Sequence, residues 1–495
     1  MNTLCIHTVY TNTARVKRQH LGAAMCQGMK QRGYEMRQIE EPARQIPVLM
    51  NADIVVVGGG TTGPLAAIAA ARQGKSVVLI ERFGSLGGNL TLGLNTKPSG
   101  SLLGGLPLEI WNLARSSGAA GDDYIAKTKT GGVNIASPCD PEIMKMLLTR
   151  LCAEAGVQIL FETLVSRPIL EGNTIVGVVV ENKAGRSFIG AKVVVDCSAD
   201  GDVAAAAGVP FTMGSGEDGR DLKMQPVGMY FTMADVDLVA LARWARTTDD
   251  VPAQAIPDTD DKLDYGLWLT GFNKTVKAYK DRTGIDLPRE NITLKTANGL
   301  MYVNATRVLD VDVFSPVEFS AAIIDCYRQI EEYARFLIEC VPGFEKARIS
   351  QISPVLGVRE TRHIQGEYTL TADDVLKGTP FDDTIAVDVS AFDVHAPKGE
   401  DVDFQGLKPY EIPYRCMVPM GVEQLLVAGR CISADHVAHG RSRNMPACMA
   451  TGQAAGFAAS IAVSSNTTVR NISMEGLQAI LRKAGMPLHA SDLPQ

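Results

Sequence analysis

Three glycines with a specific spacing carry the clearest chemical signal in this 495-residue chain. Gly58, Gly60 and Gly63 form a G-x-G-x-x-G turn between an apolar run and a segment rich in small residues. In such a turn the first glycine allows the bend, the second lets backbone approach a pyrophosphate, and the third lets a helix pack on a strand. The helix N-terminus then offers N–H groups and partial positive charge to phosphates. The pattern predicts a dinucleotide site, to which Thr61 and Thr62 also belong.

Glu81 supports this prediction because it directly follows the next apolar run, the expected place for an acidic residue that binds a ribose hydroxyl. Beyond it, Gly84 to Asn89 adds a second glycine-rich turn, which suits backbone passing close to a phosphate or a ring system. A second G-x-G-x-x-G match at 214–219 lacks a preceding buried strand and contains acidic residues. We interpret it as a loop, so we expect one bound dinucleotide and no separate NAD(P)H domain.

Three cationic or titratable side chains are candidates for acid–base and binding roles. A redox enzyme that passes a hydride from its substrate to a bound dinucleotide also needs a base for the accompanying proton. His439 is the first candidate for this base because histidine titrates near neutral pH. The alternative is that His439 bonds to the cofactor or orders its loop. Arg359 is a candidate to bind a substrate carboxylate in a bidentate manner, and Arg441 is a candidate to bind an anionic or strongly polar substrate. The alternatives are an internal ion pair between Arg359 and Glu360, and a solvated loop cation at Arg441.

Buried strands and helices must position these residues. The runs 53–57 and 76–80 predict parallel strands joined by a helix over 66–71, which makes one βαβ unit. A helix is predicted over 140–155, with strands at 157–164, 174–182 and 192–197. A long amphipathic helix is expected over 316–340, and irregular surface over 373–413. A last strand at 424–428 leads to a glycine-rich helix that starts near Pro446.

Composition narrows the class of protein. There are 48 Lys and Arg against 55 Asp and Glu, a net charge of −7, which argues against a nucleic-acid partner. None of the 10 cysteines is spaced C-x-x-C, so zinc ribbons and iron–sulfur clusters are disfavoured, and we expect no metal. The apolar stretch 448–463 contains Gln453 and many small residues, which favours a buried helix over a membrane span. We therefore expect a cytoplasmic protein without membrane insertion.

Four segments together resemble the bacterial FAD-dependent oxidoreductase family, over about residues 50–470. They read VVVGGGTTGPLAAIAAARQGKSVVLIERFGSLGGNLT, NGLMYVNATRV, LGVRETRHIQGEYTLT and LLVAGRCISADHVAHGRSRNMPACMATGQAAG. The chain also resembles, more distantly, the flavin-binding component of heterodisulfide reductase and the succinate dehydrogenase/fumarate reductase flavoproteins. The resemblance implies FAD held by the residues already named and by Arg82, Gly87, Gly88, Asn89, Val165, Ser198, Ala199, Asp200, Gly429, Arg430, Asp435, Ala447 and Met449.

The chain departs from the family pattern in two places. Where the family usually has glycine in the turn at 197–202, this chain has Ala199, which restricts the backbone slightly without abolishing the turn. The run that usually reads His-Gly-Ser-x-Arg-Val-Met-Pro here carries Arg441 and Asn444, next to the expected flavin ring. Arg441 therefore favours an anionic or strongly polar substrate.

We predict an α/β protein: a discontinuous, Rossmann-like FAD-binding domain of glutathione-reductase-like topology with an inserted α+β cap that binds substrate. The predicted parts are an N-terminal α/β extension (1–50), the first part of the FAD domain (51–212, with a local insert at 96–139), the cap (213–412), the last part of the FAD domain (413–470) and a C-terminal helix and tail (471–495).

The predicted function is transfer of hydride from a small polar or anionic substrate to noncovalently bound FAD, as in a dehydrogenase or oxidase. Oxygen, a quinone or a protein partner would reoxidise the flavin. The alternatives are a fumarate-reductase-like reduction of an activated double bond, and a redox-neutral or electron-transferring flavoprotein. Formation of a homo-oligomer is left open.

Overall fold

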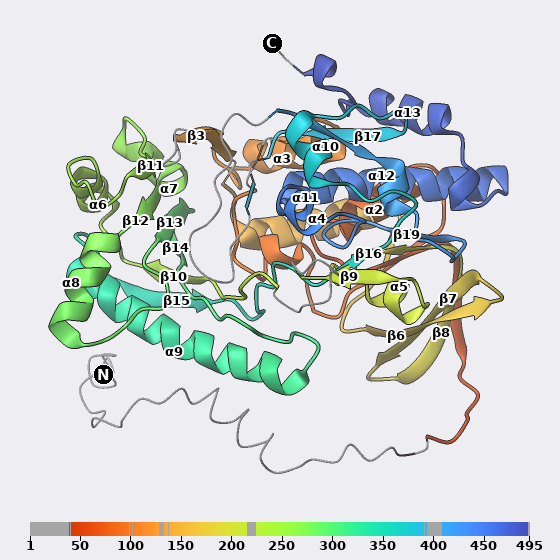
Figure 1. Cartoon of the computed structure of the whole chain (residues 1–495), viewed down its shortest axis with the longest axis horizontal. Helices are drawn as coiled ribbons and strands as arrows, with labels where there is room; N and C mark the ends of the chain where they lie inside the picture. The colour runs from red at the N-terminus through yellow and green to blue at the C-terminus, as the bar shows by residue number, and fades with distance from the viewer. Residues whose placement is uncertain are drawn as a thin grey trace.

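The computed structural model describes residues 39, 41–98, 100, 102–127, 133–136, 138–214, 224–390, 392–393 and 408–493 (Figure 1). Most of the predicted extension at 1–50 and nearly all of the glycine-rich loop at 214–219 lie outside these residues. The prediction that 373–413 forms irregular surface is wrong for its described residues, which include α10 (Ala372–Lys377), β17 (Thr384–Asp388) and β18 (Tyr410–Pro413).

A seven-stranded sheet forms the centre of the larger half of the molecule. Its inner strands β2 (Val77–Ile80), β1 (Val48–Val57) and β8 (Gly185–Asp196) are parallel. The strand order is β5-β2-β1-β8-β7-β6, and β19 (Leu425–Val427) also pairs with β8. The remaining bounds are β5 (Gln158–Leu160), β6 (Leu164–Glu171) and β7 (Thr174–Asn182). Ile54 to Val57 are buried, as expected for a strand covered on both faces.

Helices rich in small residues cover this sheet. α2 (Gly63–Ala71) connects β1 to β2, and α12 (Met445–Ser465) packs against α2. A Cβ atom on Gly456 would lie 2.2 Å from the Ala66 carbonyl oxygen, so glycine is what allows the two helices to approach this closely. α12 is long and apolar enough to cross a membrane, but 83% of its most apolar window is buried inside the protein. α3 (Gly105–Ser116), α4 (Pro141–Glu154) and α13 (Met474–Lys483) complete this half.

A second, antiparallel sheet forms the other half, at the left of Figure 1. Its strand order is β11 (Ala253–Ala255), β12 (Trp268–Gly271), β13 (Ile292–Ala297), β14 (Leu300–Asn304), β10 (Phe231–Ala234) and β15 (Arg348–Ile352). The long helix α9 (Pro316–Cys340) has the bounds that the sequence predicts, because Ser315 accepts a hydrogen bond from the Glu318 N–H and Pro316 starts the first turn. α6 (Leu238–Ala245), α7 (Leu263–Gly266) and α8 (Asn273–Thr283) belong to the same half.

Two hydrophobic cores correspond to the two halves. The buried residues of the second core run from Val227 to Leu356, whereas Ile364, Ile385 and Ile412 belong to the first core. The range predicted for the cap, 213–412, is therefore wider than the second core. Short elements connect the halves or lie beside them: β3 (Tyr124–Lys127), β4 (Val133–Ala136), α5 (Asp202–Ala206), β9 (Phe211–Met213), β16 (Arg362–Ile364) and α11 (His436–Ser442).

Candidate active site

A cavity of about 990 Å³ extends from the turn between β1 and α2 to the second sheet. At one end it is lined by Gly58, Gly60 and Glu81, and at the other by Tyr230, Trp268 and Lys295. A cavity of this size matches the upper range of ligand and cofactor sites, which lie preferentially between domains. It therefore has room for a large ligand that contacts both halves of the protein.

The β1–α2 turn is built so that one end of this cavity accepts phosphate groups. Gly58 has φ of +97°, and a Cβ on Gly63 would lie 1.8 Å from the Gly58 carbonyl oxygen, so both positions require glycine. Gly60 differs, because a Cβ there would meet no protein atom within 4 Å. Its open side faces the cavity. The backbone can thus be approached closely at Gly60 by a pyrophosphate, as the sequence pattern predicts.

Glu81 stands at the end of β2 and is held by two backbone groups. The Gly59 N–H donates to its Oε2 at 2.6 Å and the Phe83 N–H to its Oε1 at 2.8 Å. Burial raises the pKa of Glu81, although both of these bonds oppose the rise. The carboxylate is thus fixed in one orientation at the cavity wall, where its remaining lone pairs can accept bonds from a ribose.

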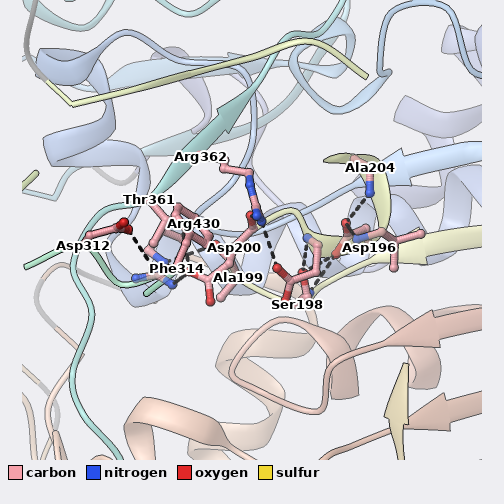
Figure 2. Close-up of polar contacts among 12 residues, drawn as sticks. Asp196, Ser198, Ala199, Asp200, Ala204, Asp312, Phe314, Thr361, Arg362 and Arg430 are labelled. Atoms are coloured by element: carbon pink, nitrogen blue, oxygen red, sulfur yellow. Dashed lines mark hydrogen bonds and ion pairs between the residues drawn. The ribbon is translucent and has the colours of Figure 1, made fainter. Parts of the chain in front are cut away.

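A polar network lies at the end of β8 (Figure 2). Its residues Ser198, Ala199 and Asp200 line the cavity. Asp196 accepts bonds from the N–H groups of Ser198, Val203 and Ala204 at 2.9–3.0 Å. The following turn contains Ala199 with φ of +71°, so the turn forms despite the missing glycine. Arg430 bonds to the carboxylate of Asp200 and to the Val358 carbonyl, and thereby ties this turn to the segment that leads from the second sheet.

Most predicted cofactor residues line the cavity. They are Gly58, Gly60, Thr61, Thr62, Glu81, Arg82, Gly88, Asn89, Val165, Ser198, Ala199, Asp200 and Arg430. Others shape its walls from behind: the Gly87 N–H donates to the Gly59 carbonyl at 2.8 Å, and the Gly429 N–H donates to Thr451 Oγ1 at 3.0 Å.

Three predicted cofactor residues lie elsewhere. Asp435 caps α11, with Oδ1 accepting from the Ala438 N–H at 2.7 Å, and its Oδ2 accepts from the Ala372 N–H at 2.6 Å. Ala447 and Met449 are 1% exposed and do not line the cavity, whereas Met445 and Cys448 of the same helix do. The predicted helix therefore meets the cavity through Met445 and Cys448.

His439 does not reach the cavity that it was predicted to serve. It lies in α11 with no exposed surface, and its ring is 4.5 Å from the ring of His363 between centroids. Burial, followed by His363, lowers the pKa of His439 well below its usual value. An enclosed imidazole that is separated from the cavity has no path to a substrate proton, so the structure gives it no geometry for the predicted role of base.

Arg441 is also buried, so the predicted alternative of a solvated cation in a loop is wrong. Its guanidinium donates to the carbonyls of Ser390 and Val375 at 2.8 Å and lies 4.3 Å from the centroid of the Tyr410 ring. Burial lowers the pKa of Arg441, and the nearby carboxylate of Asp388 opposes that shift. The predicted contact between Arg441 and an anionic substrate is therefore absent from this arrangement.

Arg359 does line the cavity, as its predicted role requires, and donates to the Pro226 carbonyl at 2.5 Å. Burial, with the nearby charge of Arg289, lowers its pKa to about 10. The predicted alternative was an ion pair between Arg359 and Glu360, but other residues bind the Glu360 carboxylate. That carboxylate accepts from His436 Nδ1 at 2.7 Å and from the Gln225 N–H at 3.0 Å.

Four further cations line the cavity that were not predicted from the sequence: Lys97, Arg289, Lys295 and Arg443. Lys97 is only 2% exposed, with its Nζ 4.5 Å from the centroid of the Trp268 ring. Arg443 donates to Asp393 Oδ2 at 2.8 Å. Arg443 occupies the arginine of the family's His-Gly-Ser-x-Arg run, which was a usable signal. Arg289 and Lys295 lie beside or on β13, where no local pattern marks them.

The residues at the first end of the cavity fit FAD. The open space at Gly60, the fixed carboxylate of Glu81 and the N-terminus of α12 at Met445 face one continuous cavity. A helix N-terminus of this kind stabilises negative charge, such as that of a phosphate or a reduced flavin ring.

Comparison with known proteins gives the following similarities. A curated urocanate reductase from Eggerthella lenta is 40% identical over 65 residues, which are 13% of this chain and 11% of that protein. Among solved structures, a geranylgeranyl bacteriochlorophyll reductase-like protein from Thermoplasma acidophilum has a TM-score of 0.47 at 14% identity, with 88% of this chain and 84% of that chain covered. L-proline dehydrogenase from P. horikoshii has a TM-score of 0.40 at 13% identity, with 87% and 96% covered.

The decisive match is to a family. Residues 53–481 match the family described as FAD dependent oxidoreductase. This range includes the β1–α2 turn, the whole second sheet and α12. The chain belongs to the FAD dependent oxidoreductase family.

Proposed function

We propose that this enzyme oxidises a small anionic substrate that binds in the part of the cavity formed by the second sheet. Bound FAD supplies two-electron chemistry by accepting a hydride, or by returning one in the reverse direction. The protein's contribution is to hold the substrate, to exclude water and to exchange one proton.

The observation that carries this proposal is the gathering of cations at the far end of the cavity. Lys295, Arg289 and Arg359 line it beside the aromatic rings of Tyr230 and Trp268. Arg289 is held by Asn304 Oδ1 at 3.2 Å, and Arg359 by the Pro226 carbonyl, so both guanidinium groups are oriented before a ligand arrives. Preoriented arginines favour carboxylates, and aromatic walls favour the planar or apolar part of a small molecule.

Lys97 replaces His439 as the candidate proton acceptor. Burial, together with the charge of Lys295, lowers the pKa of Lys97 well below its usual value of 10.5. A buried lysine of this kind can be neutral near physiological pH and can then take a proton from a substrate. Since Lys97 lines the cavity beside Trp268, it lies where such a substrate would bind.

Reduction of an activated double bond is the second candidate function, and Arg359 favours it. That reaction needs a proton donor at the substrate, and a pKa of about 10 makes Arg359 a stronger acid than an ordinary arginine. The short match to urocanate reductase points the same way but covers only 11% of that protein.

Anaerobic titration of the purified, FAD-loaded protein separates these functions. A panel of small carboxylates is added while absorbance near the flavin band is followed, and bleaching by one of them identifies an oxidised substrate. If none bleaches the flavin, the same panel is tested as oxidants of the chemically reduced protein. Reoxidation by an unsaturated carboxylate would establish the reductase, and no response in either direction would contradict both proposals.

We also propose a cellular compartment and an electron acceptor for the reaction. The cysteines that the structure describes are all free, and most are buried, which suits a reducing compartment such as the cytoplasm. We propose oxygen, a quinone or a protein as the electron acceptor, and a small molecule as the main partner.

A further inference from the structure

Behind the cavity wall, three side chains that bind metals in many proteins meet in the protein interior. They are Glu360, His363 and His439, and each is at most 2% exposed. Glu360 lies between Arg359 and β16, His363 lies on β16, and His439 lies on α11. Their potential ligand atoms all lie within 4.8 Å of one another. None of the three lines the cavity, so the cluster is separate from the proposed substrate site.

Three of the four imidazole nitrogens of this cluster have no hydrogen-bond partner among the residues that the structure describes. Both nitrogens of His439 and the Nε2 of His363 are buried without one. His363 Nε2 lies 3.2 Å from Glu360 Oε1, but outside hydrogen-bond geometry. A buried polar atom without a partner destabilises the folded state, so three of them in one place require an explanation.

We propose that Glu360, His363 and His439 bind one divalent transition-metal ion. Two imidazoles and one carboxylate are a donor set that suits Zn²⁺ and Fe²⁺ better than Mg²⁺ or Ca²⁺, which take oxygen ligands. An ion would occupy the lone pairs that are otherwise unused. The absence of cysteine pairs led to the expectation of no metal, but these ligands are separated by up to 79 positions in sequence and only the fold brings them together.

A second set of contacts orients the carboxylate, as is usual for metal ligands. His436 Nδ1 lies 2.7 Å from Glu360 Oε1, and the Gln225 N–H donates to Glu360 Oε2 at 3.0 Å. Each carboxylate oxygen keeps a further lone pair for an ion. Such outer contacts fix ligand orientation and strengthen metal binding.

The ion's position indicates a positioning role. Glu360 follows Arg359, whose side chain lines the cavity, and His439 precedes Arg443 and the start of α12, which also line it. One ion would therefore tie the segment leaving the second sheet to the N-terminal end of α12. It would fix two walls of the cavity without touching the substrate.

Metal analysis of the FAD-loaded protein tests this proposal. Because the cluster is enclosed, the protein is produced in medium supplemented with Zn²⁺ or Fe²⁺, and metal is measured by mass spectrometry after extensive dialysis. We expect about one ion per chain, and X-ray absorption should show nitrogen and oxygen ligands at about 2.0–2.2 Å. A shell with sulfur at about 2.3 Å would instead indicate binding by cysteines and would overturn the assignment.

Variants make the test specific. His363→Gln and His439→Gln should each lose most of the metal while FAD content stays near that of the parent protein. His489→Gln is the matched control, since His489 also faces a carboxylate, Glu411 Oε1 at 2.9 Å, in a partly exposed site. Metal content unchanged in both cluster variants would overturn the proposal.

A measurement on the unmodified protein covers the case in which the variants do not fold. Removal of the ion with a strong chelator under mild denaturation should lower the midpoint of thermal unfolding, and Zn²⁺ should restore it while Mg²⁺ does not. Less than roughly 0.1 ion per chain from every medium, with no effect of added ions on unfolding, would also overturn the proposal.

Discussion

At the scale of single residues, Ala199 stands in a backbone conformation that glycine adopts more easily. Its φ of +71° places it in the left-handed region, which costs an alanine about 1 kcal/mol relative to glycine. Ala199→Gly should therefore raise the free energy of unfolding, by somewhat less than 1 kcal/mol because glycine also gains entropy in the unfolded chain. Urea denaturation of the two proteins measures the difference, with Ala207→Gly, at an ordinary helical φ, as the destabilising control.

The proposed role of Lys97 predicts how the rate of oxidation depends on pH. If Lys97 accepts the substrate proton, it must be neutral, so kcat/KM for oxidation should rise with pH and level off above its pKa. Since that pKa is well below 10.5, the rise should be complete before the ordinary lysine range. Lys97→Met should remove the pH-dependent rise and lower kcat/KM by about 10²–10⁴-fold. A variant that keeps the parent profile would assign the proton to another group.

Arg441 and Arg443 should give opposite results although they are two positions apart. Arg441→Met removes a buried cation beside Asp388 and should cost about 3–5 kcal/mol of stability. Arg443→Gln changes a group that lines the cavity, so it should lower turnover, and it should lower the unfolding midpoint less than Arg441→Met does because glutamine can still donate to Asp393. Thermal unfolding and flavin reduction rates of both variants check this, and a loss of activity without loss of stability in Arg441→Met would contradict it.

The position of a residue can be predicted from the sequence where backbone geometry fixes it, and cannot where burial decides it. Gly58, Gly60 and Glu81 lie as predicted because the β–turn–α pattern determines their positions. His439 and Arg441 do not line the cavity, because the run His-Gly-Arg-Ser lies in a buried helix instead of a loop, whereas the following Arg443 does line it. Nothing local in the sequence signals that this helix is enclosed by α10 and β16.

At the scale of elements, the turn between β1 and α2 contains one glycine that cofactor binding requires and another that folding requires. Gly60→Ala places a methyl group where no protein atom lies, so the protein should fold with its parent stability and lose FAD. Gly63→Ala places it 1.8 Å from the Gly58 carbonyl oxygen, so this variant should be destabilised whether or not FAD is present. The flavin-to-protein absorbance ratio and circular dichroism of both variants distinguish the two effects. Normal FAD content in Gly60→Ala would contradict this placement of the pyrophosphate.

Elements themselves were predictable wherever apolar periodicity was strong. The helix at 316–340 and the strand at 174–182 have the predicted bounds, while β8 begins at Gly185, seven residues earlier than predicted. The cations on and near β13 were not predictable, because their meeting with Lys97 depends on how the second sheet faces the first. That contact is a property of tertiary structure and has no local pattern.

At the scale of the whole molecule, the two halves with their separate cores share one cavity. A bound ligand should therefore make the two halves unfold in one cooperative transition. Arg430 and the segment around Val358 connect the halves, and FAD would contact the first half beside that connection. Because a ligand that binds only the folded state stabilises it by about 2.7 kcal/mol at 100 times its Kd, added FAD should raise the unfolding midpoint by a few degrees.

The fluorescence of the tryptophans can report on the thermal unfolding of each half. Trp111 lies in α3 of the first half, whereas Trp244 and Trp268 lie in the second. In the FAD-loaded protein, flavin release and the fluorescence change of Trp111→Phe, which retains only the second-half tryptophans, should share one midpoint. Without FAD, the first half loses its ligand and should unfold at a lower temperature. The unfolding midpoint from circular dichroism, which reports on both halves, should then fall below the midpoint from the fluorescence of the second half. Coincident midpoints in both states, unaffected by FAD, would mean that the cofactor does not contribute to the contact between the halves.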